Sequence, residues 1–391
     1  MPFARVIFTH GHCFVCGITK NIVNVPAETR KQVFIMRRLY VPKGNRCCPG
    51  HFFNSIIDTK ELRNYFEYLS VNNNSNIKDT IGDFTLSEER LKIFIGLTWE
   101  NLIKLRGMMT SLRNSEQRDV TQVIVVFLFK FRAGNSNSMI AAILGLEREQ
   151  QVSDFCRSVI NSFEKDILPC YFGFATLPRK NLIEDQTTLV ATKVYSITDQ
   201  LALIFDGTYI RHQKSSNNEY QLKSNSGQKK VPLCKPFTIC TTNSYVVEVI
   251  SPFCATLNDA QIMKIAMEDP NGLQTLLKPG DICIVDPGFR DVTSYLEERG
   301  YRVLMPALKG KRNRLTTAES NASRHVTKIR WVAEAIHGII EQKYKFLHHQ
   351  MDNKLLPKVS LYCRIACFLN NTFGKRLNSD VGLSDEIVER S

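Results

Sequence analysis

The stretch Leu201-Ala-Leu-Ile-Phe-Asp-Gly-Thr-Tyr-Ile210 decides the fold of this chain. It begins with a continuous apolar run, as expected for a central strand covered on both faces, and Asp206 follows that run directly. Because side chains alternate along a strand, Ile204, Asp206 and Thr208 are expected on one face. A carboxylate in so apolar a strand is costly unless it pairs, caps or holds a metal. The stretch therefore predicts a buried sheet with an acidic residue that needs a partner.

The sequence that follows predicts the rest of an α/β domain. Further strands are expected at Pro236 to Thr242, Tyr245 to Ser251, Gly280 to Val285 and Tyr301 to Met305, and helices at Asn258 to Met267, Asp291 to Arg299 and Ala318 to Leu347. Three meandering strands followed by strand, helix, strand and helix predict a mixed sheet with helices packed on it.

Three acidic residues occupy rigid positions of this predicted domain. Asp206 and Asp286 each follow an apolar strand, and Glu334 lies on the long helix. The buried stripe of that helix is Val326, Ile329, Ala333, Ile336, Ile340 and Tyr344, and the neighbouring row is Arg330, Glu334, His337 and Glu341. In phosphoryl chemistry, two Mg²⁺ or Mn²⁺ ions are held by a small number of hard anionic oxygens on rigid elements. The alternative is that the aspartates merely end strands and the glutamate is solvated, but the combined placement favours a metal site.

The segment between Thr85 and Leu168 has a helical pattern. Helices are expected from Trp99 to Met109, from Val120 to Arg132 with Gly134 as its left-handed cap, from Met139 to Leu144 capped by Asn137 or Ser138, and from Glu147 to Ile167. Helix, short helix, glycine turn and longer helix is the outline of a helix-turn-helix. A helical bundle that serves only as a spacer stays an equal alternative. Glu147 and Glu149 at the start of the last helix repel phosphate, which argues against groove reading.

The N-terminal region carries a pattern of metal ligands. Cys13 and Cys16 form one close pair and Cys48 and His51 another, which is tetrahedral zinc spacing. Cys47 is an alternative to Cys48, and His10 and His12 are spare candidates. A unit this small needs a stabilising cross-link to fold, which favours bound zinc over the alternative of four side chains without a metal. The chain is therefore divided into a zinc-binding module at 1–65, a linker at 66–84 that contains the polar stretch Ser70 to Ile77, a helical region at 85–170 and an α/β domain at 195–375.

Composition limits the classes of function. The chain has 391 residues, a formal charge of +13 and 12 cysteines, and its longest apolar run, Val123 to Phe129, is far too short to cross a bilayer. A transmembrane protein is therefore excluded, and the N-terminus has no signal-peptide pattern, so the cysteines are expected in a reducing compartment. Positive charge concentrates in residues 1–60 and 301–350, which favours an anionic partner, either nucleic acid or a membrane surface.

Five motifs in order resemble a known family. They are Asp206-Gly-Thr-Tyr-Ile210, the stretch from Tyr220 to Pro236, Asn258-Asp-Ala260, Val285-Asp-Pro-Gly-Phe-Arg-Asp291 and the stretch from Arg324 to Glu334. Together they resemble the DDE-superfamily endonucleases, in particular the Harbinger-like DNA transposases and proteins derived from them. The resemblance spans roughly residues 95 to 375, and the N-terminal unit is similar to the zinc modules that transposases carry for DNA binding.

The resemblance implies a fold, a reaction and partners. It implies an RNase H-like domain in which Asp206, Asp286 and Glu334 are the catalytic residues and hold two Mg²⁺ or Mn²⁺ ions, while Asp259 and Asp291 match acidic positions without an assigned role. Double-stranded DNA, both transposon ends and target, is the expected substrate, and the nucleus the expected location. A homo-oligomer and a separate DNA-binding accessory protein stay open, as does a domesticated protein that binds DNA without cutting it. The cations expected to contact DNA backbone are Lys309, Lys311, Arg312, Arg314 and Arg330.

Overall fold

The chain divides into two units, Met1–Thr85 and Leu86–Ser391. The computed structural model describes residues 88–114, 119–227 and 229–377, and in the first unit the segments 4–5, 11–15, 18–27, 29–30, 33, 39–41, 43–53 and 56–57. The predicted linker at 66–84 and its polar stretch lie outside the described residues. Among the helices described, none is both long and apolar enough to cross a membrane.

The described part of the first unit consists of short paired strands around a small core. Strand β1 (Ala4–Arg5) pairs with β3 (Leu39–Tyr40), β2 (Val23–Asn24) with β4 (Arg46–Cys47), and β5 (Phe52–Phe53) with β6 (Ile56–Ile57). The buried apolar residues of this described part are Cys13, Phe14, Val15, Val25, Val33, Val41 and Cys47. Among the described residues of this unit these few apolar side chains bury little surface, and small units with little buried surface rely on a metal or a disulfide.

The second unit begins with helices. They are α3 (Glu88–Ile95), α4 (Trp99–Met108), α5 (Val120–Ala133), α6 (Asn137–Ile143), α7 (Glu149–Ser162), a π-helical segment (Phe163–Ile167), α8 (Leu168–Tyr171), α9 (Arg179–Glu184) and α10 (Leu189–Tyr195). Gly134 ends α5 in the left-handed conformation (φ 69°), as predicted. The predicted cap of α6 is wrong: the Ser136 side chain, and not Asn137 or Ser138, accepts the Met139 N–H.

A mixed sheet follows the helices, in agreement with the sequence. Its strands are β7 (Ala202–Gly207), β8 (Ile210–Arg211), β9 (Leu233–Thr241), β10 (Val246–Cys254), β11 (Ile282–Ile284) and β12 (Arg302–Leu304). The order is β10-β9-β7-β11-β12, and β8 pairs with β9. Strands β7, β9 and β10 are antiparallel neighbours, whereas β11 runs parallel to β7 and β12.

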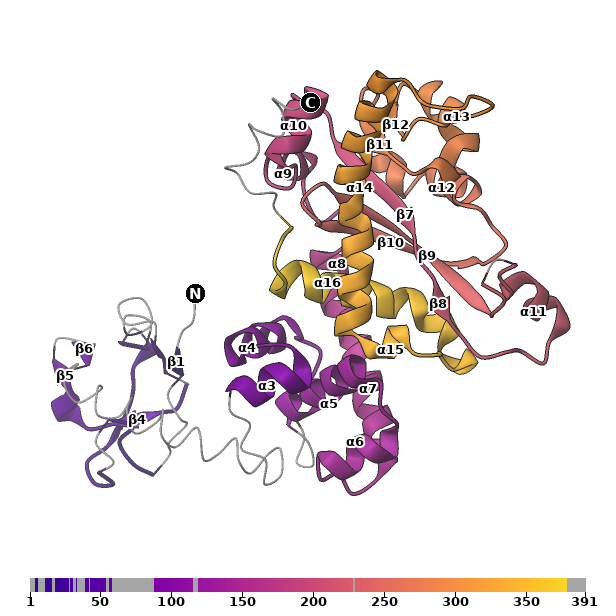
Figure 1. Cartoon of the computed structure of the whole chain (residues 1–391). Helices are drawn as coiled ribbons and strands as arrows, with labels where there is room; N and C mark the ends of the chain where they lie inside the picture. The colour runs from indigo at the N-terminus through magenta and orange to yellow at the C-terminus, as the bar shows by residue number, and fades with distance from the viewer. Residues whose placement is uncertain are drawn as a thin grey trace. The chain divides into compact units, whose positions relative to one another are not determined.

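Helices cover both faces of the sheet. The remaining helical elements are α11 (Asn218–Ser224), α12 (Asp259–Glu268), two 3₁₀ segments (Leu273–Thr275 and Pro287–Val292), α13 (Thr293–Glu297), α14 (Thr317–Lys343), α15 (Lys345–His348), a further 3₁₀ segment (Asn353–Lys358) and α16 (Val359–Phe373). Ile204 packs in one core cluster with α14 and α16, while Phe205, the next residue of β7, packs with α12. Figure 1 shows α14 crossing the face of the sheet, where it contacts β7. The predicted alternation along β7 is confirmed, and it places Asp206 on the α14 side.

The first cluster also contains the buried residues of α3 to α7, so these helices share a core with the sheet. Phe131 of α5 packs on Tyr344 with ring centroids 4.8 Å apart. The predicted helix from Ala318 to Leu347 is therefore too long, since α14 ends at Lys343. The next residue, Tyr344, leaves the helical conformation (φ −119°, ψ 80°) and is buried against Phe131.

Candidate active site and metal centre

Asp206 lies inside the protein, at the end of β7. Its side chain is 14% exposed, and Oδ2 lies 3.8 Å from Nη1 of Arg330 and 3.7 Å from Nδ1 of His337. The other ring nitrogen of His337 lies 3.0 Å from the hydroxyl of Thr238, which is the residue of β9 paired with Asp206. The sheet and α14 thus hold this carboxylate in a fixed position.

The environment of Asp206 disfavours its negative charge. Burial raises the pKa of its carboxyl group to about 7, and the nearby cation of Arg330 offsets only part of this shift. The carboxylates of Asp286, Asp259 and Glu334 raise the pKa further by repulsion. A second positive charge at this place would relieve the repulsion among the four groups.

Asp286 reaches the same edge of the sheet from the neighbouring strand. Strands β7 and β11 are parallel with Ile204 opposite Ile284, so Asp206 and Asp286 each come two residues after a matched pair. Asp286 is half-buried, and its Oδ1 accepts a hydrogen bond of 2.8 Å from Gly288 N. This cap begins the 3₁₀ segment Pro287–Val292 and fixes the side chain.

Asp259 is a fourth carboxylate, to which the sequence assigned no role. It is the first residue of α12, and its two oxygens approach the glycines that follow the other aspartates. A Cβ added to Gly207 would lie 2.8 Å from Asp259 Oδ1, and one added to Gly288 would lie 3.3 Å from Oδ2. The buried ammonium of Lys235, which is 4% exposed, lies 2.8 Å from Oδ1. Two glycines inside motifs with Asp206 and Asp286 are the sequence signal that a third group approaches there.

Glu334 lies at the rim of the cluster. Its side chain is 52% exposed and accepts a hydrogen bond from Nη2 of Arg330. Arg330 therefore contacts both Asp206 and Glu334, and at 14% exposure it is part of the cluster rather than of an open surface. In the described part of the chain, the only three His, Cys, Asp or Glu ligand atoms found within 4.8 Å of one another belong to another group, in the first unit.

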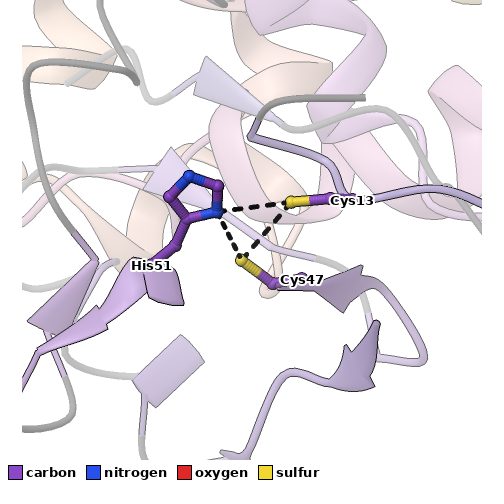
Figure 2. Close-up of side chains that lie close together, drawn as sticks. All are labelled: Cys13, Cys47 and His51. Carbon is purple, nitrogen blue, oxygen red and sulfur yellow. Dashed lines mark hydrogen bonds between the residues drawn. The ribbon is translucent and has the colours of Figure 1, made fainter. Parts of the chain in front are cut away.

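That group is Cys13, Cys47 and His51. Figure 2 shows the two thiols and the imidazole pointing toward one another. Sγ of Cys13 lies 3.7 Å from Sγ of Cys47 and 3.6 Å from Nδ1 of His51. Sγ of Cys47 lies 3.8 Å from the same nitrogen. Tetrahedral zinc with Zn–S of about 2.3 Å and Zn–N of about 2.0 Å requires ligand separations of roughly 3.5 to 3.8 Å. The three atoms therefore fit three corners of a zinc site.

The other predicted zinc ligands are placed differently. Cys47 rather than Cys48 belongs to the group of three, and the backbone N–H of Cys48 donates to Sγ of Cys13 at 3.3 Å. Cys16 and His10 lie outside the described residues, and His12 is exposed. The choice of Cys47, left open by the spacing, is the one that the geometry favours.

The predicted DNA-contacting cations other than Arg330 lie on an exposed loop before α14, called here the basic loop: Lys309, Lys311, Arg312 and Arg314. Arg312 is paired with Glu319, with 2.9 Å between Nη1 and Oε1. The other three cations have no ion pair with a described residue.

The segment that carries the carboxylate cluster matches a known family model. Residues 205–371 match the family model of the DDE superfamily endonucleases. The family-level resemblance noted from the five motifs is thereby confirmed for this segment, which contains Asp206, Asp259, Asp286 and Glu334. No curated protein and no solved structure matched the chain.

Proposed function

We propose that the chain is a metal-dependent DNA endonuclease with an RNase H-like catalytic domain, of the kind found in Harbinger-like transposases. The observation that carries the proposal is the convergence of Asp206, Asp259 and Asp286 at one sheet edge, beside Glu334 on α14, within the segment that matches the DDE endonuclease family. Burial, and then repulsion from the other three carboxylates, raises the pKa of Asp206, so the cluster fits a divalent cation better than any neutral ligand.

Asp206, Asp286 and Glu334 are the proposed holders of two Mg²⁺ or Mn²⁺ ions. Bound there, such ions would activate water as a nucleophile and stabilise the attacking and leaving oxygens of the phosphodiester. The chain's own residues fix the geometry: the cap at Gly288 orients Asp286, and Arg330 orients Glu334. His337 lies beside Asp206 and is itself oriented by Thr238.

The first unit supports this proposal as a DNA-binding module. Cys13, Cys47 and His51 would hold a structural Zn²⁺, with the fourth position open to Cys16 or another ligand. Helices α5, α6 and α7 have the order of a helix-turn-helix, and α7 begins at Glu149, so we expect it to contribute position rather than base reading. Double-stranded DNA as substrate and partner implies a nuclear location.

The second candidate is a domesticated protein that binds DNA without cutting it. Cleavage activity distinguishes the two functions. A protein that only binds DNA has no use for a group of repelling carboxylates around the largely buried Asp206, because such a group costs stability. A homo-oligomer or an accessory protein is compatible with either function.

Nicking of supercoiled plasmid by the full chain in Mg²⁺ or Mn²⁺ tests the proposal. We expect Asp206→Asn, Asp286→Asn and Glu334→Gln each to abolish nicking while DNA affinity stays near that of the wild type, since side-chain volume is kept and one anionic ligand is lost. Asp291→Asn is the matched control, because Asp291 is 64% exposed and pairs only with neighbouring Arg290 among the described residues. Wild-type protein that binds DNA but never nicks it would establish the domesticated alternative.

A further inference from the structure

A cavity lies outside the carboxylate cluster. It has a volume of about 310 Å³ and is formed where α5 and α7 meet α15, the 3₁₀ segment Asn353–Lys358 and the start of α16. All these elements belong to the second unit. The volume is at the lower end of the roughly 300–1,000 Å³ that small-ligand pockets occupy.

The wall of this cavity is aromatic. Tyr362 packs on Phe346 with centroids 4.9 Å apart and on Phe131 at 6.2 Å, and Phe127 continues the cluster from Phe131 at 5.4 Å. Phe346 is half-buried and therefore the ring that remains partly open, with Leu355 beside it. A flat ring system can lie against such a surface.

The rim of the cavity is cationic. Its lining residues include Lys130, Arg157, Lys354 and Lys358, and no Asp or Glu. Arg157 is paired with Asp154 at 3.3 Å, and Lys130 donates to Asn137. Lys354 and Lys358 are exposed, and neither makes a side-chain ion pair with a described residue. An apolar aromatic pocket with these two lysines at its rim matches a ligand that is a flat ring joined to anionic groups.

We propose that this pocket, called here the cationic pocket, holds an unpaired nucleotide of the DNA substrate, its base against Phe346 and its flanking phosphates at Lys354 and Lys358. Base stacking on aromatic side chains combined with cations along the backbone is how proteins bind unpaired nucleic acid. The pocket is also near the proposed chemistry, since α15 follows directly on the helix that carries Glu334. Nine residues of helix from Glu334 to Lys343 span about 14 Å at 1.5 Å per residue, which is roughly four base steps of a duplex.

The inference rests on the proposed function, because it assumes a DNA substrate. The test uses the full chain without divalent cations, so that no strand is cut, and three fluorescent probes of one sequence: a paired duplex, the duplex with one unpaired thymidine, and the duplex with one unpaired abasic nucleotide. Wild-type protein is expected to bind the thymidine probe about 5- to 150-fold more tightly than the abasic probe.

Two variants separate the base from the phosphates. Ser153→Trp fills the pocket, and we expect it to remove the preference for the thymidine probe without weakening the abasic one. Lys354→Ala with Lys358→Ala should weaken the binding of both probes. It should also reduce the slope of log affinity against log salt concentration by about 0.9 per lost phosphate contact. Lys165→Ala with Lys278→Ala is the control, since both lysines are exposed and outside the pocket, and it should leave the preference intact.

A crosslinking experiment in the unchanged protein keeps the test independent of variant folding. An unpaired 5-iodouridine should crosslink to Phe346 or Tyr362. Equal affinity for the thymidine and abasic probes, or a crosslink elsewhere in the chain, overturns the inference about the pocket. If the protein nevertheless nicks plasmid, the proposed function is retained. Protein that binds none of the three probes overturns both. Binding to phosphatidylserine-rich vesicles that depends on Lys354 and Lys358, without a base preference, would assign the pocket to a lipid headgroup instead.

Discussion

The guanidinium of Arg330 lies beside the carboxylate of Asp206, with 3.8 Å between Nη1 and Oδ2. Its other terminal nitrogen binds Glu334, so two of the four carboxylates share one positive charge. Since a divalent cation at the cluster would provide the same neutralisation, Arg330 and the metal are expected to be partly interchangeable for stability.

Replacing Arg330 tests this relationship. Arg330→Met is expected to lower the free energy of unfolding by about 2–4 kcal/mol in EDTA, because a buried carboxylate loses its cation. Mg²⁺ should raise the melting temperature of the variant more than that of the wild type. Arg290→Met is the matched control, since Arg290 pairs with Asp291 at the surface, and we expect a change below about 1 kcal/mol. Equal Mg²⁺ stabilisation of variant and wild type would show that no cation replaces the guanidinium.

His337 makes stability depend on pH. Burial, reinforced by the charge of Arg330, lowers the pKa of His337 to about 4, against about 6.5 in an unfolded chain. The unfolded chain therefore binds this proton more readily, and stability present above pH 6.5 is lost as the pH falls toward 4. An NMR titration of the imidazole in the metal-free protein measures the midpoint directly. A midpoint at or above 6.5 would contradict the expectation. His337→Gln should remove this contribution and leave the opposite one of Asp206, whose pKa of about 7 in the folded protein favours the folded state as the pH falls.

The zinc site predicts a specific pattern of metal loss. The full chain, purified under reducing conditions, should contain one zinc by elemental analysis. Cys13→Ser and Cys47→Ser should lose it, because each removes a thiolate from the group of three, whereas Cys48→Ser should keep it. A zinc content below about 0.2 per chain would favour a metal-free unit. If the Cys48 variant loses the zinc and the Cys47 variant keeps it, Cys48 is the ligand in place of Cys47.

The basic loop is expected to contact the DNA backbone through three of its four cations. Neutralising Lys309, Lys311 and Arg314 should lower affinity about equally for all sequences and shallow the log-log salt dependence by about 0.9 per lost phosphate contact. Arg312→Gln should change the slope least, because Arg312 is already paired with Glu319. Fluorescence anisotropy across a salt series measures the slopes, and an unchanged slope in the triple variant would remove the loop from the DNA path.

The pair of Asp259 and Lys235 is expected to be strongly coupled. Lys235→Met and Asp259→Asn should each destabilise the protein, the lysine being 4% exposed and the aspartate 26%. The double variant should recover part of the loss, because neither charge is then left alone, giving a coupling energy of about 1–3 kcal/mol in urea unfolding. Purely additive effects would mean that the two groups do not stabilise each other.

The spacing of apolar residues predicted much of the fold because it reflects which faces of the helices and strands are buried. The alternation around Asp206 and the apolar stripe of α14 both follow from which faces are covered, so the sheet and its helices were predictable. Contacts between distant segments were not: the end of α14 at Tyr344 depends on Phe131, and the proximity of Asp259 depends on two glycines elsewhere. Spacing also left Cys47 and Cys48 equivalent, since adjacent residues differ only in direction once the backbone is folded.

The shared core of α5, the π-helical segment and α16 also has a consequence for synthesis. Phe163 packs on Phe368 with centroids 6.0 Å apart, although most of the α/β domain lies between them in the sequence. A nascent chain leaving the ribosome has made its most apolar helices long before α16 emerges to cover them. Those helices are expected to expose apolar surface until then, and messages truncated before Val359 should yield insoluble protein even though every proposed catalytic residue is already present.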